Sequence, residues 1–434
     1  MLTPDFKEYI NKIIELQKVK MLWNNVPVSW KVFDEKELEY AIESILDCHW
    51  TEWRFNKQFE TKLSEFLWVK YLCTTNSWSS ANLLAFTALT AKELKERQIK
   101  KWDEVITVAA WFPTTINPII QNWCIPVFVD VDLETYEVNI EELKKAISPK
   151  TKAIMMAHTL WNAFNIWEVK KICEENNFWL IEDNCDALWT KYDWKYTWTF
   201  WDISTFSFYP AHHITMWEGW ALATNNALLM KIIKSYRDWW RDCWCNTWED
   251  NNCNNRFNWQ LWDLPKWFDH KYTYSRIGYN LKITDMQAAI WLAQLEKLEN
   301  FIQIRKNNFA YLTKKILENW LDKYFILPKQ TEKVEASWFG FILSLKENVW
   351  FSRKELMMYL NENKIGTRLL FAWNFVRQPA FIDYVTDYRI VWDLKNTDYI
   401  MNNTFWIWLY QWLNQKKLDY VILKFKEFII KFDI

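Results

Sequence analysis

The chain has 434 residues, enough for a full-sized hydrophobic core and a second, smaller domain. Its 53 Lys and Arg residues against 54 Asp and Glu give a net charge of −1, which argues against a binder of nucleic acid or anionic membranes. No stretch reaches the roughly 18 uncharged apolar residues of a membrane span, and residues 1–20 form a charged amphipathic helix pattern rather than a signal peptide. We expect a soluble, cytoplasmic protein whose eight cysteines are thiols or metal ligands.

The chain contains 34 tryptophans and only 4 glycines. Average glycine usage of about 7% would give roughly 30 glycines in a chain of this length. Tryptophan stands where glycine is usual: Trp102 in a loop entering a strand, Trp179 between a helix end and a strand, and Trp194 after Asp193 in a predicted hairpin. A bulky residue in the left-handed region costs about 1–2 kcal/mol, so many such sites would exhaust the stability of a domain.

We therefore hypothesise that most of these tryptophans are glycines in the natural protein. One route is a gene that uses UGA for glycine, translated as though UGA meant tryptophan. Five tryptophans have a neighbour better placed as the glycine and are expected to be genuine: Trp50, Trp239, Trp244, Trp259 and Trp406.

The chain divides into three parts. After an N-terminal helical segment, 1–35, helical and strand patterns alternate from about residue 36. Helices are predicted over 35–47, 80–97, 139–147 and 168–177, and strands over 103–110, 125–132, 151–159 and 179–184. This alternation predicts a large α/β domain, 36–294, with a mostly parallel sheet that binds ligands at the carboxyl ends of its strands. A long helix over 296–319 opens a smaller C-terminal α+β domain, 295–434.

Two short stretches carry candidate binding residues. The segment 75–86, with small hydroxylated residues between a strand and a helix, offers free backbone N–H groups to a phosphate, or its serines only cap the helix. Asp183 ends a buried strand, where a carboxylate needs a partner. It could pair with a cationic cofactor nitrogen or cap the next element.

Four cysteines form a second pattern. Cys185 is followed by Cys243, Cys245 and Cys253, and the last three lie in one polar loop. Three thiols in so short an irregular loop suggest thiolate ligation of zinc or of an iron–sulfur cluster, although they could also be unconnected thiols. Cys48, Cys73, Cys124 and Cys173 fall in helix or strand patterns and are predicted to be core residues.

Several segments together resemble one family. The stretches at 49–71, 76–82, 182–189, 206–221 and 278–291 are similar to the sugar aminotransferases of the DegT/DnrJ/EryC1/StrS family. The resemblance implies the fold-type I, aspartate-aminotransferase-like architecture of pyridoxal phosphate (PLP)-dependent transferases. In the family loop S-F-[HY]-P-x-K-x-I-T-x-G-E-G-G, Trp217 and Trp220 stand at glycine positions, and the Schiff-base lysine falls on His212.

An imidazole cannot hold PLP as an internal aldimine, so ordinary transamination is not expected. One branch of the family combines this lysine-to-histidine change with four cysteines at this spacing: the CDP-4-keto-6-deoxyglucose 3-dehydrases of 3,6-dideoxyhexose and O-antigen biosynthesis. The resemblance implies a lyase with pyridoxamine phosphate (PMP) and a [2Fe–2S] cluster on Cys185, Cys243, Cys245 and Cys253. His212 would be the base that allows the C3 hydroxyl of a nucleotide sugar to leave, and Asp183 would keep the pyridine nitrogen protonated. Electrons would come from a separate NADH-dependent flavin/iron–sulfur reductase.

Other family positions carry over as further cofactor contacts. Phe112 matches the aromatic residue that stacks on the cofactor ring, and Ser207 with Trp78–Ser79 matches the phosphate cradle. Asn280 matches a residue that reaches the phosphate from a second subunit, which implies a homodimer. His213 and His158 are expected to be packing residues.

Three alternatives stay open. A plain PLP sugar aminotransferase would need the missing lysine, and a cluster-free 3-dehydratase would leave the cysteine pattern unexplained. A third possibility is a non-catalytic protein of the same fold, in which the four cysteines hold a structural zinc.

Overall fold

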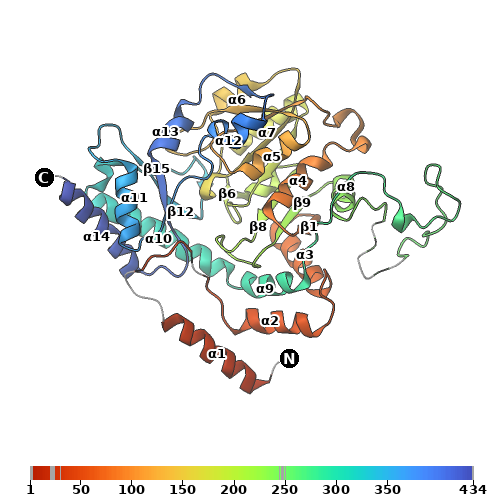
Figure 1. Ribbon diagram of the computed structural model, residues 1–434, viewed down its shortest axis with the longest axis horizontal. Coiled ribbons are helices and arrows are strands. Elements are labelled where there is room, and N and C mark those ends of the chain that lie inside the picture. Colours follow the sequence, from red (N-terminus) through yellow and green to blue (C-terminus); the bar gives the residue numbers. More distant parts are fainter. Residues whose placement is uncertain are drawn as a thin grey trace.

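The computed structural model describes residues 3–19, 25–29, 31–243, 245, 249 and 251–432. Its centre is an eight-stranded sheet (Figure 1). In spatial order the strands are β1 (Tyr71–Thr75), β9 (Trp220–Thr224), β8 (Ile203–Ser207), β5 (Trp179–Asp183), β4 (Thr151–Ala157), β2 (Glu104–Val108), β3 (Ile125–Val129) and β14 (Arg389–Ile390). All neighbours from β8 to β14 pair in parallel, whereas β9 is antiparallel to both β1 and β8.

The parallel strands are buried because helices cover the sheet. β2 and β5 are buried along their whole length, as expected for the centre of a parallel sheet with two covered faces. The helices that precede or connect its strands are α2 (Glu35–Leu46), α3 (Arg54–Leu67), α4 (Trp78–Ala88), α5 (Pro113–Gln121), α6 (Ile140–Ala146), α7 (Ile166–Asn176), α8 (Ala227–Arg237) and α9 (Asp285–Leu295). Short 3-10 turns η1 (Lys92–Arg97), η2 (Thr159–Trp161), η3 (Thr197–Thr199) and η4 (His270–Tyr272) lie in the connections.

The C-terminal part forms a second, four-stranded sheet. Its order is β10 (Phe325–Ile326), β12 (Gly340–Leu345), β15 (Thr404–Trp408) and β13 (Thr367–Arg368), all antiparallel. The helical elements of this part are α10 (Leu298–Glu318), η5 (Leu321–Lys323), α11 (Arg353–Glu362), η6 (Phe375–Arg377), α12 (Pro379–Tyr384), α13 (Lys395–Asn403) and α14 (Gln415–Phe432). A three-stranded sheet joins β11 (Val334–Glu335), β6 (Lys191–Tyr192) and β7 (Lys195–Tyr196).

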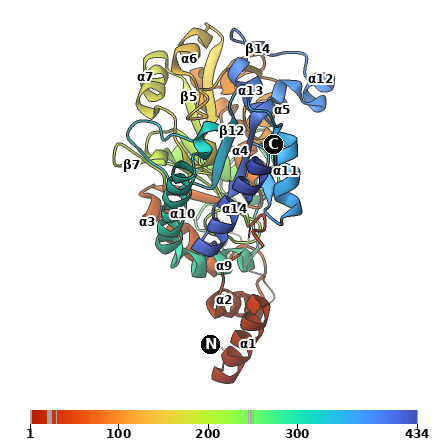
Figure 2. The same cartoon turned by 90° about the vertical axis from the view of Figure 1, so that its left-hand side faces the viewer.

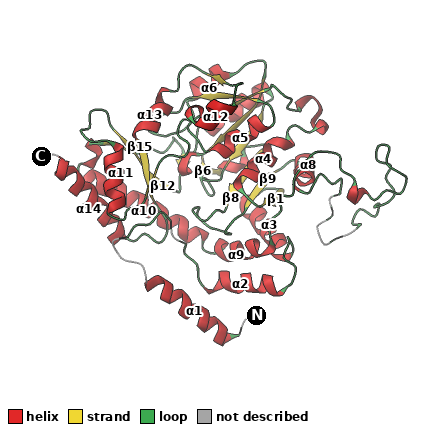
Figure 3. Cartoon of the chain, viewed as in Figure 1, coloured by secondary structure: helices red, strands yellow, loops and turns green. Residues whose placement is uncertain are grey.

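Two regions project from this body. Helix α1 (Pro4–Val19) lies beyond α2 at the lower end of the molecule (Figure 2). Between α8 and α9 the chain runs through a long stretch dominated by loop (Figure 3). None of the described helices combines the length and apolarity that a bilayer crossing requires.

The structure differs from the predicted elements at three points. The helix predicted over 80–97 is two elements, α4 and η1. The left-handed residue after α7 is Asn177 (φ 54°), not Trp179, which is the first residue of β5; Asn adopts this conformation more readily than other non-glycine residues. Cys48, predicted to be a core residue, is exposed just after α2, whereas Cys73, Cys124 and Cys173 are buried.

Backbone conformation bears on the glycine hypothesis. Half of the non-glycine residues with positive φ in the described part of the chain are tryptophans: Trp68, Trp102, Trp123, Trp189, Trp194, Trp217, Trp239, Trp240, Trp262, Trp267, Trp320, Trp373 and Trp392. In the β6–β7 hairpin both central residues, Asp193 (φ 49°) and Trp194 (φ 67°), are left-handed, the geometry of an Asp-Gly turn. Trp239, expected to be a genuine tryptophan, also has a positive φ, as does its neighbour Trp240. The backbone thus carries glycine-like conformations at many tryptophan positions.

Candidate active site

A pocket of about 640 Å³ opens beside the carboxyl ends of β5 and β8. Four predicted site residues line it: Trp78, Ser79, Phe112 and His212. Trp78 and Ser79 begin α4, Phe112 precedes α5, and His212 lies in the loop between β8 and β9. The loops converge because parallel neighbours end at the same edge of the sheet.

Asp183 lies at the end of β5 with no exposed surface, and five groups donate hydrogen bonds to it. Its Oδ2 accepts from Asn82 Nδ2 at 2.7 Å, Thr115 Oγ1 at 2.7 Å and Trp78 Nε1 at 3.1 Å. Its Oδ1 accepts from the backbone N–H of Cys185 at 3.0 Å and from Thr205 Oγ1 at 3.5 Å. These donors stabilise a carboxylate, and the Asn82 and Thr115 contacts could not be predicted from the strand pattern alone.

The indole of Trp78 occupies the space in front of Asp183. It stacks on Phe112 with a centroid distance of 4.5 Å and an interplanar angle of 15°, and His212 lies edge-on to it at 6.4 Å. The flat indole ring of Trp78 thus lies among three groups. Phe112 stacks on it, the Asp183 carboxylate accepts its N–H, and His212 lies at its edge. A pyridine ring with a protonated nitrogen needs the same three surroundings, so the residues fit a pyridoxamine-type cofactor if position 78 has no side chain.

His212 is buried and uncharged. Desolvation by burial lowers its pKa to about 3, and the positive charges of Arg305 and Lys31 act in the same direction. Its backbone N–H donates to the Tyr209 carbonyl at 2.9 Å, and Arg305 donates to the His212 carbonyl at 3.4 Å. Its ring packs 5.3 Å from that of Phe339. A neutral imidazole on a pocket wall can accept a proton.

The predicted phosphate residues are only partly brought together. Ser77 caps α4 by accepting from the N–H of Ser80 at 3.1 Å, and Ser77 and Ser79 both line the pocket at the positive end of the helix dipole. Ser207 is buried at the end of β8, where its hydroxyl accepts from the N–H of Tyr209 at 3.2 Å. It does not belong to the residues that line the pocket.

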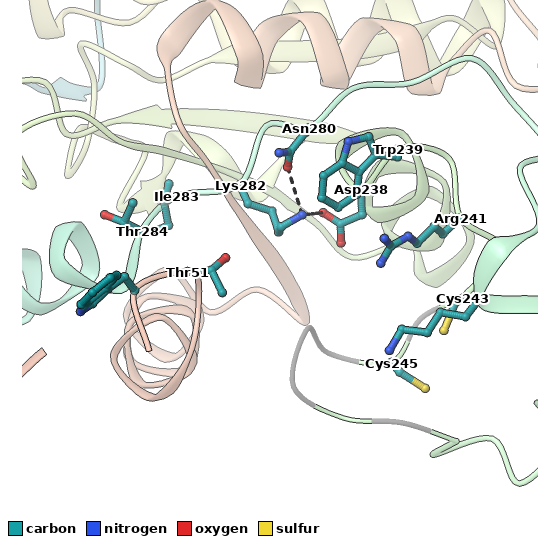
Figure 4. Close-up of a pocket in the computed structure, with 12 residues that line it drawn as sticks. Thr51, Asp238, Trp239, Arg241, Cys243, Cys245, Asn280, Lys282, Ile283 and Thr284 are labelled. Atoms are coloured by element: carbon teal, nitrogen blue, oxygen red, sulfur yellow. Dashed lines mark hydrogen bonds and ion pairs between the residues drawn. The ribbon is translucent and has the colours of Figure 1, made fainter. Parts of the chain in front are cut away.

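Asn280 lines a different pocket, of about 400 Å³ (Figure 4). Lys282 Nζ donates to Asn280 Oδ1 at 3.0 Å and pairs with Asp238 at 3.6 Å. The sulfurs of Cys243 and Cys245 lie at the other end of this pocket. Asn280 therefore stays apart from the His212 pocket within one chain, and its predicted contact with a second subunit stays a prediction.

The four cysteines of the predicted cluster are not gathered. Cys185 is buried behind Asp183, 3.9 Å from the Thr205 hydroxyl, whereas Cys243, Cys245 and Cys253 are half-buried. Cys253 Sγ contacts His270 Nε2 at 3.2 Å. Among the described residues, which include all four thiols, no three His, Cys, Asp or Glu side chains are arranged to hold a metal ion. The thiols are suitable donors for iron or zinc, but their placement does not form a site.

The two histidines that were predicted to be packing residues, His213 and His158, are both buried. His213 contacts Ser337 Oγ through Nε2 at 2.6 Å. His158 contacts Glu182 through Nε2 and stacks on Phe164 at 4.6 Å. Neither lines the His212 pocket.

Sequence reasoning missed two residues beside His212. Asp186 Oδ1 lies 3.4 Å from His212 Nδ1, and burial together with the neighbouring Asp183 raises the pKa of Asp186 well above its ordinary value. Arg305, fully buried on α10, donates to the carbonyls of Leu409, Phe339 and His212. Asp186 follows Asp183 by three residues, so the sequence could have predicted that it lies at the same strand end. The proximity of Arg305 to His212 could not have been predicted, because 93 residues separate them in the chain.

Comparison with known proteins places these features in one family. The chain is 54% identical to the lipopolysaccharide biosynthesis protein RfbH of Salmonella typhimurium, over 97% of this chain and 95% of the relative. It is 42% identical to dTDP-4-dehydro-2,6-dideoxy-D-glucose 3-dehydratase of Saccharopolyspora spinosa, over 93% and 86% of the two chains.

Solved structures agree with the sequence relatives. The fold is similar to that of Escherichia coli GDP-4-keto-6-deoxy-D-mannose-3-dehydratase with bound hydrated PLP, with a TM-score of 0.82 and 29% identity over 92% of this chain and 99% of that chain. The architecture is therefore that of PLP-dependent sugar aminotransferases, with a large mostly parallel sheet. A family model matches residues 32–426, and the chain belongs to the DegT/DnrJ/EryC1/StrS aminotransferase family.

Proposed function

We propose that this chain is a cytoplasmic PMP-dependent 3-dehydratase. Its substrate would be a nucleotide-linked 4-keto-6-deoxyhexose, CDP-4-keto-6-deoxyglucose, in 3,6-dideoxyhexose and O-antigen biosynthesis. The observation that carries the proposal is His212, which takes the family's lysine position in the pocket that Phe112 also lines. Two relatives that the chain covers over 86% and 98% of their length are named as 3-dehydratases, and this supports the same reaction type.

The roles of the residues follow from their surroundings. When bound, the cofactor would supply an amine for the sugar carbonyl and a ring that accepts an electron pair. Asp183, held by Asn82 and Thr115, would accept a hydrogen bond from the ring nitrogen and keep it protonated. Phe112 would stack on the ring, and Ser79 at the start of α4 would bind the phosphate.

His212 would act as the base. Its imidazole is neutral because burial lowers its pKa, so a ring nitrogen is available to accept the proton that dehydration requires. Among the described residues that line this pocket there is no lysine, which disfavours the plain aminotransferase alternative.

We further propose that Cys185, Cys243, Cys245 and Cys253 hold the [2Fe–2S] cluster that delivers electrons from an NADH-dependent flavin/iron–sulfur reductase. The support is their spacing in the sequence and the proximity of Cys243 and Cys245 at one end of a pocket. The four thiols do not form a metal-binding group among the described residues, so cluster binding would require Cys243, Cys245 and Cys253 to approach Cys185. We also propose a homodimer in which Asn280 reaches the cofactor phosphate of the other subunit.

The reaction can be tested with purified protein, PMP, CDP-4-keto-6-deoxyglucose and a reductant. The 3-dehydratase converts the sugar to a product lacking the C3 oxygen, which mass spectrometry detects. Formation of a 4-amino sugar with PLP and L-glutamate would instead identify an aminotransferase. The absence of both products, together with one bound zinc, would identify the non-catalytic alternative.

A further inference from the structure

We propose that Asp186 is a positioning residue that orients His212 through the Nδ1 edge of its ring. The proposal rests on the proposed role of His212 as the base. It assigns Asp186 no contact with substrate or cofactor. The relationship is the 3.4 Å approach of Asp186 Oδ1 to His212 Nδ1.

The two residues meet because of the sheet topology. Asp186 follows β5 and His212 follows β8, and these strands are parallel neighbours, so both connections leave the same sheet edge. Both side chains are almost fully buried, with 2% of Asp186 and 7% of His212 exposed. Solvent therefore competes little for their polar atoms.

Each residue has one buried polar atom without a partner. His212 Nδ1, which faces Asp186 Oδ1, and Asp186 Oδ2, the other oxygen of the same carboxyl group, are buried and make no hydrogen bond within the described part of the chain. Their approach exceeds the usual hydrogen-bond length of about 2.7–3.2 Å by a few tenths of an ångström. Buried polar groups are normally paired, and catalytic hydrogen bonds often tighten only when ligands bind. If the gap between Asp186 Oδ1 and His212 Nδ1 closes by a few tenths of an ångström, His212 Nδ1 gains the partner that it lacks.

The charges around His212 explain why a carboxylate is needed. Arg305 and Lys31 both disfavour a positive charge on the ring, and His213 is its neighbour in the chain. Asp186 brings an acidic side chain to 3.4 Å from the His212 ring. The proposal requires an ionised Asp186, which burial and Asp183 oppose, so the tautomer of His212 reports directly whether Asp186 is a carboxylate. With Asp186 ionised, a proton on Nδ1 that faces it leaves Nε2, on the opposite edge, free to accept a proton. The same carboxylate stabilises the imidazolium that then forms.

The test is ¹⁵N NMR of the full-length, PMP-loaded protein labelled at its five histidines. His212→Gln assigns the resonance by its loss. The wild-type His212 ring is expected to be the Nδ1-protonated tautomer, and Asp186→Asn is expected to shift it towards Nε2 protonation. A wild-type ring protonated on Nε2 overturns the proposal without any Asp186 variant, so misfolding of that variant leaves the test intact. An unchanged tautomer in folded Asp186→Asn overturns it as well.

Turnover gives the second readout. Asp186→Asn is expected to lower kcat by about 10²–10⁴-fold, the range associated with a base that loses its orienting carboxylate, with little change in KM. Ser337→Ala, which removes a contact of the adjacent His213, is the matched control and should leave the His212 tautomer unchanged. If the NMR result holds but no sugar is dehydrated, the proposed function fails while the positioning role of Asp186 stands.

Discussion

Trp78 donates its indole N–H to Asp183 at 3.1 Å, while its ring stacks on Phe112. The donor, the acceptor and the stacking partner reproduce the surroundings that a protonated pyridine ring needs. A tryptophan at position 78 therefore competes with the cofactor for its own site. Glycine at this position leaves the Asp183 carboxylate facing an open, ring-shaped space.

Trp78→Gly should therefore strengthen cofactor binding. We expect PLP and PMP to bind at least about tenfold more tightly, equivalent to about 1.4 kcal/mol, because the indole no longer has to leave. Absorbance titration with PLP measures the dissociation constant. The exposed Trp194→Gly is the control and should leave cofactor affinity unchanged, and equal affinities for Trp78→Gly and the parent would contradict the competition.

Trp194→Gly tests whether a tryptophan in a left-handed backbone conformation destabilises the fold, as the glycine hypothesis predicts. Trp194 has φ 67° and is 88% exposed, so its replacement removes left-handed strain without opening a cavity. We expect the free energy of unfolding to rise by about 1–2 kcal/mol, measured by urea denaturation. Trp259→Gly should give no such gain, because Trp259 is not among the residues with positive φ and its ring stacks on His270 at 5.0 Å. Intact mass of protein from the native host tests the hypothesis directly.

His212→Asn should abolish dehydration, because an amide cannot accept the proton at neutral pH. We expect kcat to fall by about 10²–10⁴-fold, the usual contribution of a general base. Binding of PMP, measured by fluorescence quenching, should persist, because Asp183 and Phe112 are unchanged. Retention of most of the activity would assign the base to another residue.

The iron content of anaerobically purified protein tests the cluster. The parent should show thiolate–iron absorption that dithionite bleaches, and Cys243→Ser should lose it. Cys48→Ser, which changes an exposed thiol after α2, is the matched control and should keep the spectrum. A colourless protein with one zinc would favour the structural alternative.

His213 should make stability depend on pH. Burial, followed by the charges of Arg305, His212 and Lys306, lowers its pKa well below 6.5. The unfolded chain therefore takes up a proton at His213 before the folded chain does. The contribution of neutral His213 is fully present above pH 6.5 and is lost as the pH falls, by at most about 1.4 kcal/mol per pH unit. Urea denaturation between pH 7 and pH 5 should show a flatter pH dependence for His213→Gln than for the parent; identical slopes would mean that folding leaves the pKa of His213 unchanged and would contradict the prediction.

The family, the parallel sheet and the types of chemical group could all be predicted from the amino-acid sequence. Strands and helices have their own hydrophobic periodicities, which depend only on neighbouring residues, so β5 and α7 could be located in the sequence. The family loop motif likewise identified His212 from the sequence. The unusual glycine count likewise predicted left-handed tryptophans such as Trp194.

Which of these groups lie in contact could be read only from the folded structure. It brought Asp186 to His212 and Arg305 to the His212 carbonyl, contacts that depend on strand order and on packing between distant segments. It also placed the indole of Trp78 against Asp183, 105 residues away, and it did not gather the four candidate cysteines of the described chain into one metal-binding group. Sequence patterns indicate the backbone conformation and burial that each residue prefers. The distances between site residues from different segments depend on the order of the strands in the sheet and on how the loops at the strand ends converge.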